Sequence, residues 1–173
     1  MNQRILLRCL YAVVMFQISV LIVEYGGAVY PLWTGQEIKL KTIPIDPRSM
    51  FRGNYARLRY QIGTIPAKDI DTIRAPRHGE PVYVGLKPGK NGIYVYDRAY
   101  LERPPDAVYI RGRIQAQNRR DTSSRYPVLY GIEAFFAPKE KALQLEKTMR
   151  QGGIAMVMIA GNGKATLKDV LSL

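Results

Sequence analysis

The stretch that decides the fold runs from Asp46 to Tyr60 and reads DPRSMFRGNYARLRY. Its first two residues predict a turn, because the Asp46 side chain can bond the backbone ahead of it and Pro47 fixes its own φ. Gly53 adds a second point at which the backbone is permissive. From Asn54 onward apolar and polar residues alternate, which predicts an extended chain. The segment is therefore expected to be a turn that leads into a half-buried strand.

The two faces of this expected strand differ in chemistry. The inner face would carry Ala56, Leu58, Tyr60 and Ile62, and the outer face would carry Tyr55, Arg57, Arg59 and Gln61. Two cations beside a phenol could hold an anion or a polar polymer, but a sheet face that only meets water is the more common role of such a pattern. The pattern alone leaves both interpretations open.

Two runs of the sequence resemble the recurrent blocks of the GDYXXLXY family, a group of membrane-anchored bacterial proteins without an assigned activity. The first is GNYARLRY, from Gly53 to Tyr60, and the second is YGIEAFFAP, from Tyr130 to Pro138. The positions that carry the first block and its turn are Asp46, Pro47, Arg48, Arg52, Gly53, Asn54, Tyr55, Leu58 and Tyr60. The resemblance spans most of the chain and implies an exported domain behind a membrane segment, commonly associated with polytopic membrane proteins.

Asn54 is a departure from this family, because the family has Asp between the Gly and the Tyr. If that carboxylate were an acid, a base or a metal ligand in relatives, this chain would lack the activity. If it only accepts a backbone hydrogen bond, the amide oxygen of Asn54 can replace it. The substitution favours a structural role for the block, and leaves Arg52, Tyr55, Arg57 and Arg59 as the residues expected to take part in recognition.

An apolar run, Ile5–Val23, precedes the domain. As a helix it would be about 28 Å long, close to the hydrocarbon thickness of about 30 Å. Arg4 and Arg8 near its start and Glu24 after it predict an N-terminus in the cytoplasm. We therefore expect a single-pass anchor in the inner or cytoplasmic membrane.

This placement divides the chain into an anchor, residues 1–24, and one extracytoplasmic domain, residues 25–173. A cleaved signal peptide is the alternative, because the small residues Gly26, Gly27 and Ala28 resemble a cleavage region. Cleavage would give a secreted protein. The apolar run is longer than the usual signal segment of up to about 15 residues, which favours the anchor.

The residues that most chemistries need are scarce. The chain has one cysteine, Cys9, inside the apolar run, and one histidine, His78. The exported domain therefore has no thiol nucleophile and cannot form a disulfide or a histidine-based metal cluster. We expect no catalytic residue, no metal and no cofactor.

One enzymatic alternative remains, a Ser-Lys peptidase that resembles signal peptidase. Ser49-Met50 follows the anchor, as in those enzymes, but Phe51-Arg52 replaces their proline-containing motif. Lys87 stands beside a Pro-Gly turn, where water would keep it a poor base. The sequence thus favours a non-catalytic protein.

The charge balance indicates the kind of partner. There are 26 Lys and Arg against 14 Asp and Glu, a net charge of +12. Outside the cytoplasm such a surface would attract lipid head groups or anionic envelope polymers, and nucleic acid is not expected. We expect a binding or assembly component of the bacterial envelope that contacts the lipid bilayer, with a polytopic membrane protein or an anionic polymer as a further partner.

The fold class expected from the pattern is mainly β (α+β), with antiparallel strands, one C-terminal helix and a terminal hairpin. The expected strands are 37–42, 55–62, 81–87, 93–100, 108–115, 130–136, 154–160 and 164–171. A helix is expected from Pro138 to the Gly152-Gly153 pair. Asn91-Gly92 predicts a hairpin turn, and 118–125 is expected to be a loop.

Overall fold

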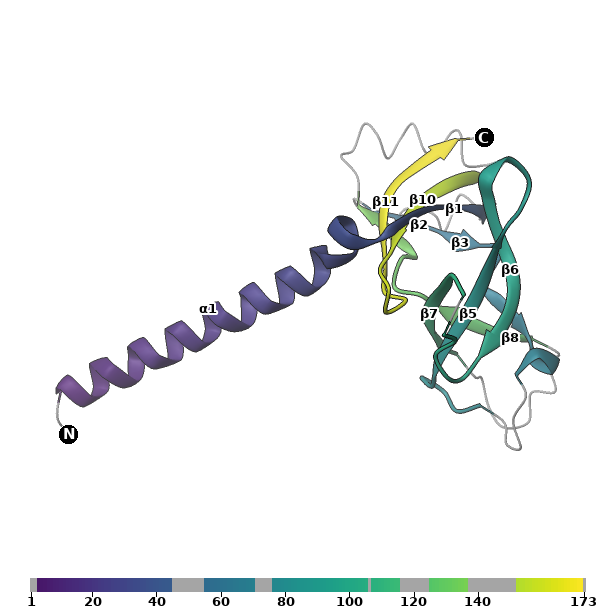
Figure 1. The fold of residues 1–173 in the computed structure, drawn as a ribbon. Helices are drawn as coiled ribbons and strands as arrows, with labels where there is room; N and C mark the ends of the chain where they lie inside the picture. The colour runs from purple at the N-terminus through teal and green to yellow at the C-terminus, as the bar shows by residue number, and fades with distance from the viewer. Residues whose placement is uncertain are drawn as a thin grey trace.

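The computed structural model has one long helix and a strand-rich domain at its C-terminal end (Figure 1). It describes residues 3–44, 55–70, 76–105, 107–115, 125–136 and 152–172. The expected architecture, an N-terminal apolar helix followed by a mostly antiparallel sheet with a terminal hairpin, is confirmed. The turn from Asp46 to Asn54 and the helix expected after Pro138 lie outside the described residues.

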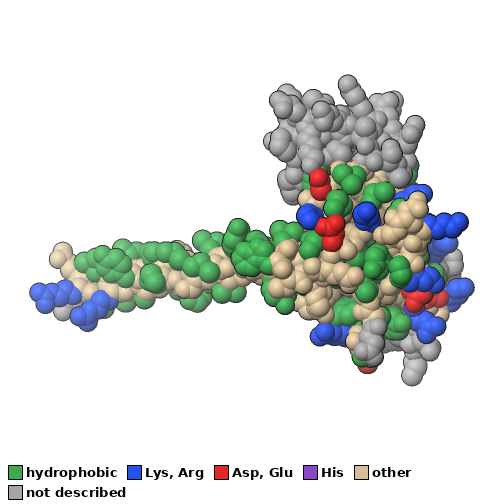
Figure 2. Space-filling view, turned by 45° about the horizontal axis from the view of Figure 1, so that its top comes forward, with side chains coloured by type: hydrophobic (Ala, Val, Ile, Leu, Met, Phe, Trp, Pro, Cys, Tyr) green, Lys and Arg blue, Asp and Glu red, His purple; other side chains and the backbone are tan. Residues whose placement is uncertain are grey.

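The helix α1 (Gln3–Thr34) is long and apolar enough to cross a membrane, a property that it shares with signal sequences. Its large apolar side chains are exposed, including Phe16 at 70% and Val23 at 73%. Figure 2 shows these side chains along the length of the helix and basic side chains at its free end. The 32 residues give a helix about 48 Å long, so α1 extends well beyond the expected Ile5–Val23 span.

The C-terminal end of α1 joins the domain without a linker. The Gly35 N–H donates to the Pro31 carbonyl at 2.9 Å, and β1 (Gln36–Ile43) begins at the next residue. A Cβ on Gly35 would lie 2.3 Å from the Pro31 oxygen, so this junction requires glycine. The Lys164 ammonium donates to the Gly27 carbonyl at 2.5 Å. The helix is thus fastened both to the first strand and to the start of the last one.

A nine-stranded sheet forms most of the domain, in the order β11-β10-β1-β6-β5-β7-β8-β4, with β3 paired to β1. The strands are β3 (Arg59–Tyr60), β4 (Thr64–Pro66), β5 (Pro81–Pro88), β6 (Ile93–Tyr100), β7 (Tyr109–Ile114), β8 (Arg125–Leu129), β10 (Gly153–Ile159) and β11 (Ala165–Ser172). The β1–β6 pairing is parallel and the others are antiparallel. A separate pair joins β2 (Tyr55–Arg57) to β9 (Ala134–Phe136), and short 3₁₀ turns occupy Ala67–Asp69 and Lys90–Gly92.

The hydrophobic core lies on the inner face of this curved sheet. Along β1 and β10, buried side chains alternate with more exposed ones. Ile38 and Leu40 of β1 and Val157 of β10 are each at most 1% exposed, while their neighbours in each strand are more exposed. Buried apolar side chains of this kind are the main stabilising term of a small domain. The Thr42 hydroxyl, also buried, accepts the Gly153 N–H at 2.7 Å and donates to the Gly153 carbonyl at 2.9 Å. β1 and β10 therefore each present one face inward, as the period of two predicts.

Six expected strands have ends within one residue of the observed ones, namely β1, β5, β6, β7, β10 and β11. The expected hairpin turn at Asn91-Gly92 is also present, with φ of 58° and 71°. Two expectations were wrong. The strand 55–62 is interrupted at Leu58, where the chain changes partner from β9 to β1. The strand 130–136 begins only at Ala134, because Gly131, with φ of +82°, turns the chain before it.

Two strands were not predicted at all, and a proline explains each omission. β4 ends at Pro66 and β8 contains Pro127, and proline weakens the sequence signal of a strand because it has no N–H to donate. β8 begins at Arg125, the last residue of the expected loop. In the β5–β6 pair Tyr83 lies opposite Tyr100, and the register shifts by one residue between Gly85 and Leu86.

Candidate functional site

The two recurrent blocks of the sequence meet in space. β2 from the first block pairs with β9 from the second, so that Tyr55 lies opposite Phe136 and Arg57 opposite Ala134. Where this pairing ends, the Leu58 N–H donates to the Glu133 carbonyl at 2.7 Å. The blocks therefore form one structural unit although they are far apart in the chain.

Two buried tyrosines fasten this unit reciprocally. The Tyr60 hydroxyl donates to the Ile132 carbonyl at 2.6 Å, and the Tyr130 hydroxyl donates to the Ile62 carbonyl at 2.6 Å. Burial raises the pKa of both phenols far above the usual value for tyrosine, and the nearby Glu133 carboxylate raises it further. Both rings therefore stay neutral and act as hydrogen-bond donors.

The Glu133 side chain stabilises the turn that begins at Tyr130. Its carboxylate accepts the Tyr130 N–H at 2.6 Å and the Gly131 N–H at 2.9 Å. Gly131 has φ of +82°, a conformation that glycine adopts without strain. The acidic residue of the second block thus satisfies backbone donors in the turn.

A family model for the GDYXXLXY protein matches residues 17–170, which include both blocks and the end of α1. The chain belongs to the GDYXXLXY family. Neither the curated proteins nor the solved structures include a significant match. In this GDYXXLXY protein, the described part of the signature is packed against the second block, and its polar contacts hold backbone groups.

The outer face of the described part of the signature is exposed. Arg57 and Arg59 are exposed and Leu58 and Tyr60 are buried, so the expected alternation is present from 57 to 62. Of the remaining residues expected in recognition or in the motif, Asp46, Pro47, Arg48, Arg52, Gly53 and Asn54 lie outside the described residues. Tyr55 contributes its backbone to β2. Arg57 and Arg59 are thus the recognition candidates that the structure brings onto one face.

We expect removal of either buried tyrosine hydroxyl to destabilise the GDYXXLXY domain. Tyr60→Phe and Tyr130→Phe each leave a buried carbonyl without its donor, at a cost of about 1–3 kcal/mol in the free energy of unfolding. Urea unfolding of the full-length chain, followed by circular dichroism, measures this cost. Tyr94→Phe is the matched control, because its hydroxyl makes only an exposed 3.3 Å bond with Gln36, and its effect should stay below about 0.5 kcal/mol.

The same variants should also differ from wild type in how their stability depends on pH in the alkaline range. Because the folded-state pKa of Tyr60 and Tyr130 is raised, the stability that their neutral forms contribute is fully present below the unfolded-state pKa of about 10 and is lost as the pH rises beyond it. Wild type should therefore lose more stability than either Phe variant between pH 8 and about pH 11. Parallel pH profiles for wild type and the variants would contradict the buried-donor role.

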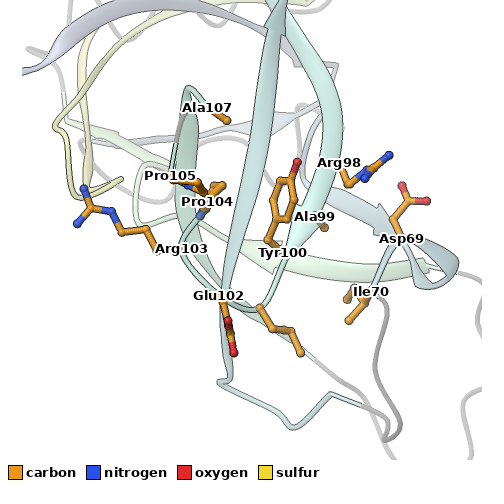
Figure 3. Close-up of a pocket in the computed structure, with 11 residues that line it drawn as sticks. Asp69, Ile70, Arg98, Ala99, Tyr100, Glu102, Arg103, Pro104, Pro105 and Ala107 are labelled. Carbon is orange, nitrogen blue, oxygen red and sulfur yellow. The ribbon is translucent and has the colours of Figure 1, made fainter.

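A depression of about 750 Å³ lies at the end of β6, where Tyr100 stands between Asp69 and Arg98 on one side and Arg103 on the other (Figure 3). Two of the charged side chains that line it form hydrogen bonds within the protein. Asp69 accepts the Tyr96 hydroxyl at 2.5 Å, and Arg103 donates to the Gly161 carbonyl at 2.9 Å. Its lining carries both signs of charge, so it has no clear electrostatic preference for one class of ligand.

A second depression, of about 570 Å³, is lined by cations. We call it the cationic groove, and its lining residues are Pro81, Tyr83, Arg111, Gly112, Arg113, Gln115, Leu129, Tyr130, Gly131, Lys164 and Ala165. The sequence patterns did not predict this groove. The available signal was Gly112, because an isolated glycine inside a strand marks a close approach of another segment, and a Cβ there would lie 2.4 Å from Val128 Cγ1.

Three observations in the described part of the chain concern metal sites and the peptidase alternative. No group of three or more His, Cys, Asp or Glu gathers there as a metal site would require. Ser49, the nucleophile of the peptidase alternative, lies outside the described residues. Lys87 forms an ion pair with Asp97 at 2.9 Å, with side chains 59% and 46% exposed, which is the solvated position that its Pro-Gly neighbourhood predicted.

Proposed function

We propose that this GDYXXLXY protein is a single-pass, membrane-anchored component of the bacterial envelope that binds or assembles with a partner outside the cytoplasm. In this proposal α1 stays attached and spans the inner or cytoplasmic membrane with its N-terminus inside. The β domain then lies at the extracytoplasmic surface of this membrane. Its basic faces are directed to an anionic envelope polymer or to an acidic surface of a polytopic membrane protein.

The observation that carries the proposal is the junction between α1 and the sheet. Besides the Lys164 contact, the Thr166 hydroxyl lies 3.4 Å from the Ala28 carbonyl, and Pro31 is buried. Removal of the helix at the small residues Gly26 to Ala28 would separate the domain from groups that it contacts. A helix that is part of the domain's packing supports an anchor that is retained and that holds the domain at a fixed height.

The face proposed for recognition is the outer side of the signature. Arg57 and Arg59 stand two residues apart on adjoining short strands, above a core that holds Leu58 and Tyr60. Guanidinium groups bind carboxylates and phosphates through paired hydrogen bonds, and a rigid backbone lowers the entropy cost of binding. The excess of basic residues adds long-range attraction to anionic partners.

The test is co-purification from membranes. Full-length wild type and the double variant Arg57→Ala, Arg59→Ala are expressed at equal levels, solubilised in mild detergent, and their bound proteins and polymers are compared. We expect the double variant to lose most of the co-purifying partner, because exposed cations of a specific interface control both attraction and orientation.

The matched control is Lys39→Ala, Lys41→Ala, which removes the same charge from exposed positions of β1. It should recover the partner at the wild-type level. If the Arg57, Arg59 variant recovers the same partners as wild type, the proposed recognition face is wrong. Equal losses in both double variants would mean that the attraction depends on net charge alone.

A further inference from the structure

The cationic groove gathers three basic side chains from two segments that are distant in sequence. Arg111 and Arg113 project from the exposed face of β7, and Lys164 immediately precedes β11. Tyr83 and Leu129 line the groove beside them. The result is a concave, basic surface with an apolar wall.

Backbone contacts keep these cations together. The Arg111 N–H donates to the Gly163 carbonyl at 2.8 Å, and the Tyr109 hydroxyl donates to the Gly161 carbonyl at 2.9 Å. A Cβ on Gly163, whose φ is +78°, would lie 2.4 Å from the Tyr109 ring, so the turn can approach β7 this closely only with glycine. The β10–β11 turn is therefore fixed on β7, and Lys164 is fixed beside the two arginines.

The groove keeps its positive charge. None of the described residues that line it is acidic. The side chains of Arg113 and Lys164 donate to the carbonyls of Gly79 and Gly27, at 3.1 and 2.5 Å, and a carbonyl satisfies a donor without neutralising its charge. The Glu133 carboxylate is directed to the Tyr130 and Gly131 N–H groups, and Glu133 is not among the residues that line the groove.

One end of the groove lies at a defined distance from the membrane that α1 would span. Lys164 contacts the carbonyl of Gly27, four residues beyond Val23 at the end of the apolar run, a rise of about 6 Å along a helix. The head-group region outside the hydrocarbon is about 5–8 Å deep on each side. Figure 1 shows the β10–β11 turn on the side of the domain next to α1. With α1 spanning the membrane, the Lys164 end of the groove would lie at the depth of the lipid phosphates.

We propose that the cationic groove binds the phosphate-bearing head group of an anionic phospholipid from the same membrane. The proposal rests on the proposed function in that α1 must remain as the anchor. The guanidinium groups of Arg111 and Arg113 suit bidentate contacts to phosphate oxygens, and Lys164 adds a point charge. Tyr83 and Leu129 offer an apolar wall to the glycerol end of the lipid. A bound head group would fix the orientation of the domain on the membrane.

The test measures lipid selectivity of the full-length chain in phosphatidylcholine vesicles that contain a trace of spin-labelled lipid. The quantity is the fraction of label held next to the protein, for phosphatidylglycerol relative to phosphatidylcholine. We expect wild type to prefer phosphatidylglycerol roughly fivefold or more, and Arg111→Gln, Arg113→Gln, Lys164→Gln to fall below about twofold. Circular dichroism of the same samples confirms that the variant is folded.

The matched control is Lys39→Gln, Lys41→Gln, Lys90→Gln, which removes three exposed cations outside the groove and keeps the attraction of Arg4 and Arg8 to anionic lipid. It should retain the wild-type preference. A folded groove variant with wild-type preference, or a wild type without preference, would overturn the assignment. Loss of preference on adding inorganic phosphate at constant ionic strength would overturn it in favour of a free anion. None of these outcomes affects the co-purification test of Arg57 and Arg59, so the two proposals can fail separately.

Discussion

Val14→Arg combined with Ile18→Arg should abolish membrane integration of this chain. The two side chains are exposed on one side of α1, near the middle of the apolar run, at 40% and 45%. Each arginine at the centre of a membrane helix costs about 2.5–3.5 kcal/mol, so the pair costs about 5–7 kcal/mol. That is a change of roughly a thousandfold or more in the insertion equilibrium. The measurement is the fraction of protein that stays with membranes after an alkaline carbonate wash.

The conservative variant Val14→Leu, Ile18→Leu keeps the apolar length and should stay in the membrane fraction like wild type. The intact mass of purified wild type separates an anchor from a signal peptide, because a retained helix leaves the N-terminal residues in place. A mature chain that begins after Ala28 would contradict the anchor, as would a double-arginine variant that resists the carbonate wash.

The sequence predicted well those strands whose limits follow from the local pattern of residues. β1 and β7 alternate in sequence with a period of two and lack proline, and their ends are placed within one residue. The errors occur where tertiary pairing overrides the local pattern. Residues 55–62 alternate without interruption, yet β2 pairs with β9 and β3 pairs with β1, and periodicity contains no information about which strand is the partner.

The candidate site was predictable only in part, for a related reason. The exposure of Arg57 and Arg59 followed from alternation. The pairing of the two recurrent blocks did not, because the contacts of Tyr60 and Tyr130 join residues 72 and 68 positions apart. The cationic groove requires the β10–β11 turn to fold onto β7, a contact made by backbone groups whose geometry the residue types do not reveal.

Leu58→Ala is expected to be the most damaging single truncation in the signature. Leu58 is 1% exposed and lies at the point where the chain leaves β2 for β3, within the hydrophobic core. Truncation of a buried leucine removes transfer free energy and leaves a cavity, at a cost of about 2–5 kcal/mol. Because small domains are stable by only about 5–15 kcal/mol, the change should shift urea unfolding of the full-length chain strongly.

Gln61→Ala provides the contrast, since Gln61 belongs to the opposite, exposed face of the same segment and its bond to Lys41 uses only its backbone N–H. Its effect should stay within about 0.5 kcal/mol. A large loss for Leu58→Ala together with a small one for Gln61→Ala would mean that the inner face of the signature stabilises the domain. An equal, small effect of both would contradict the core position assigned to Leu58. Because the inner face is tested through unfolding and the outer face through partner recovery, the two experiments separate the packing role of the signature from its proposed role in recognition.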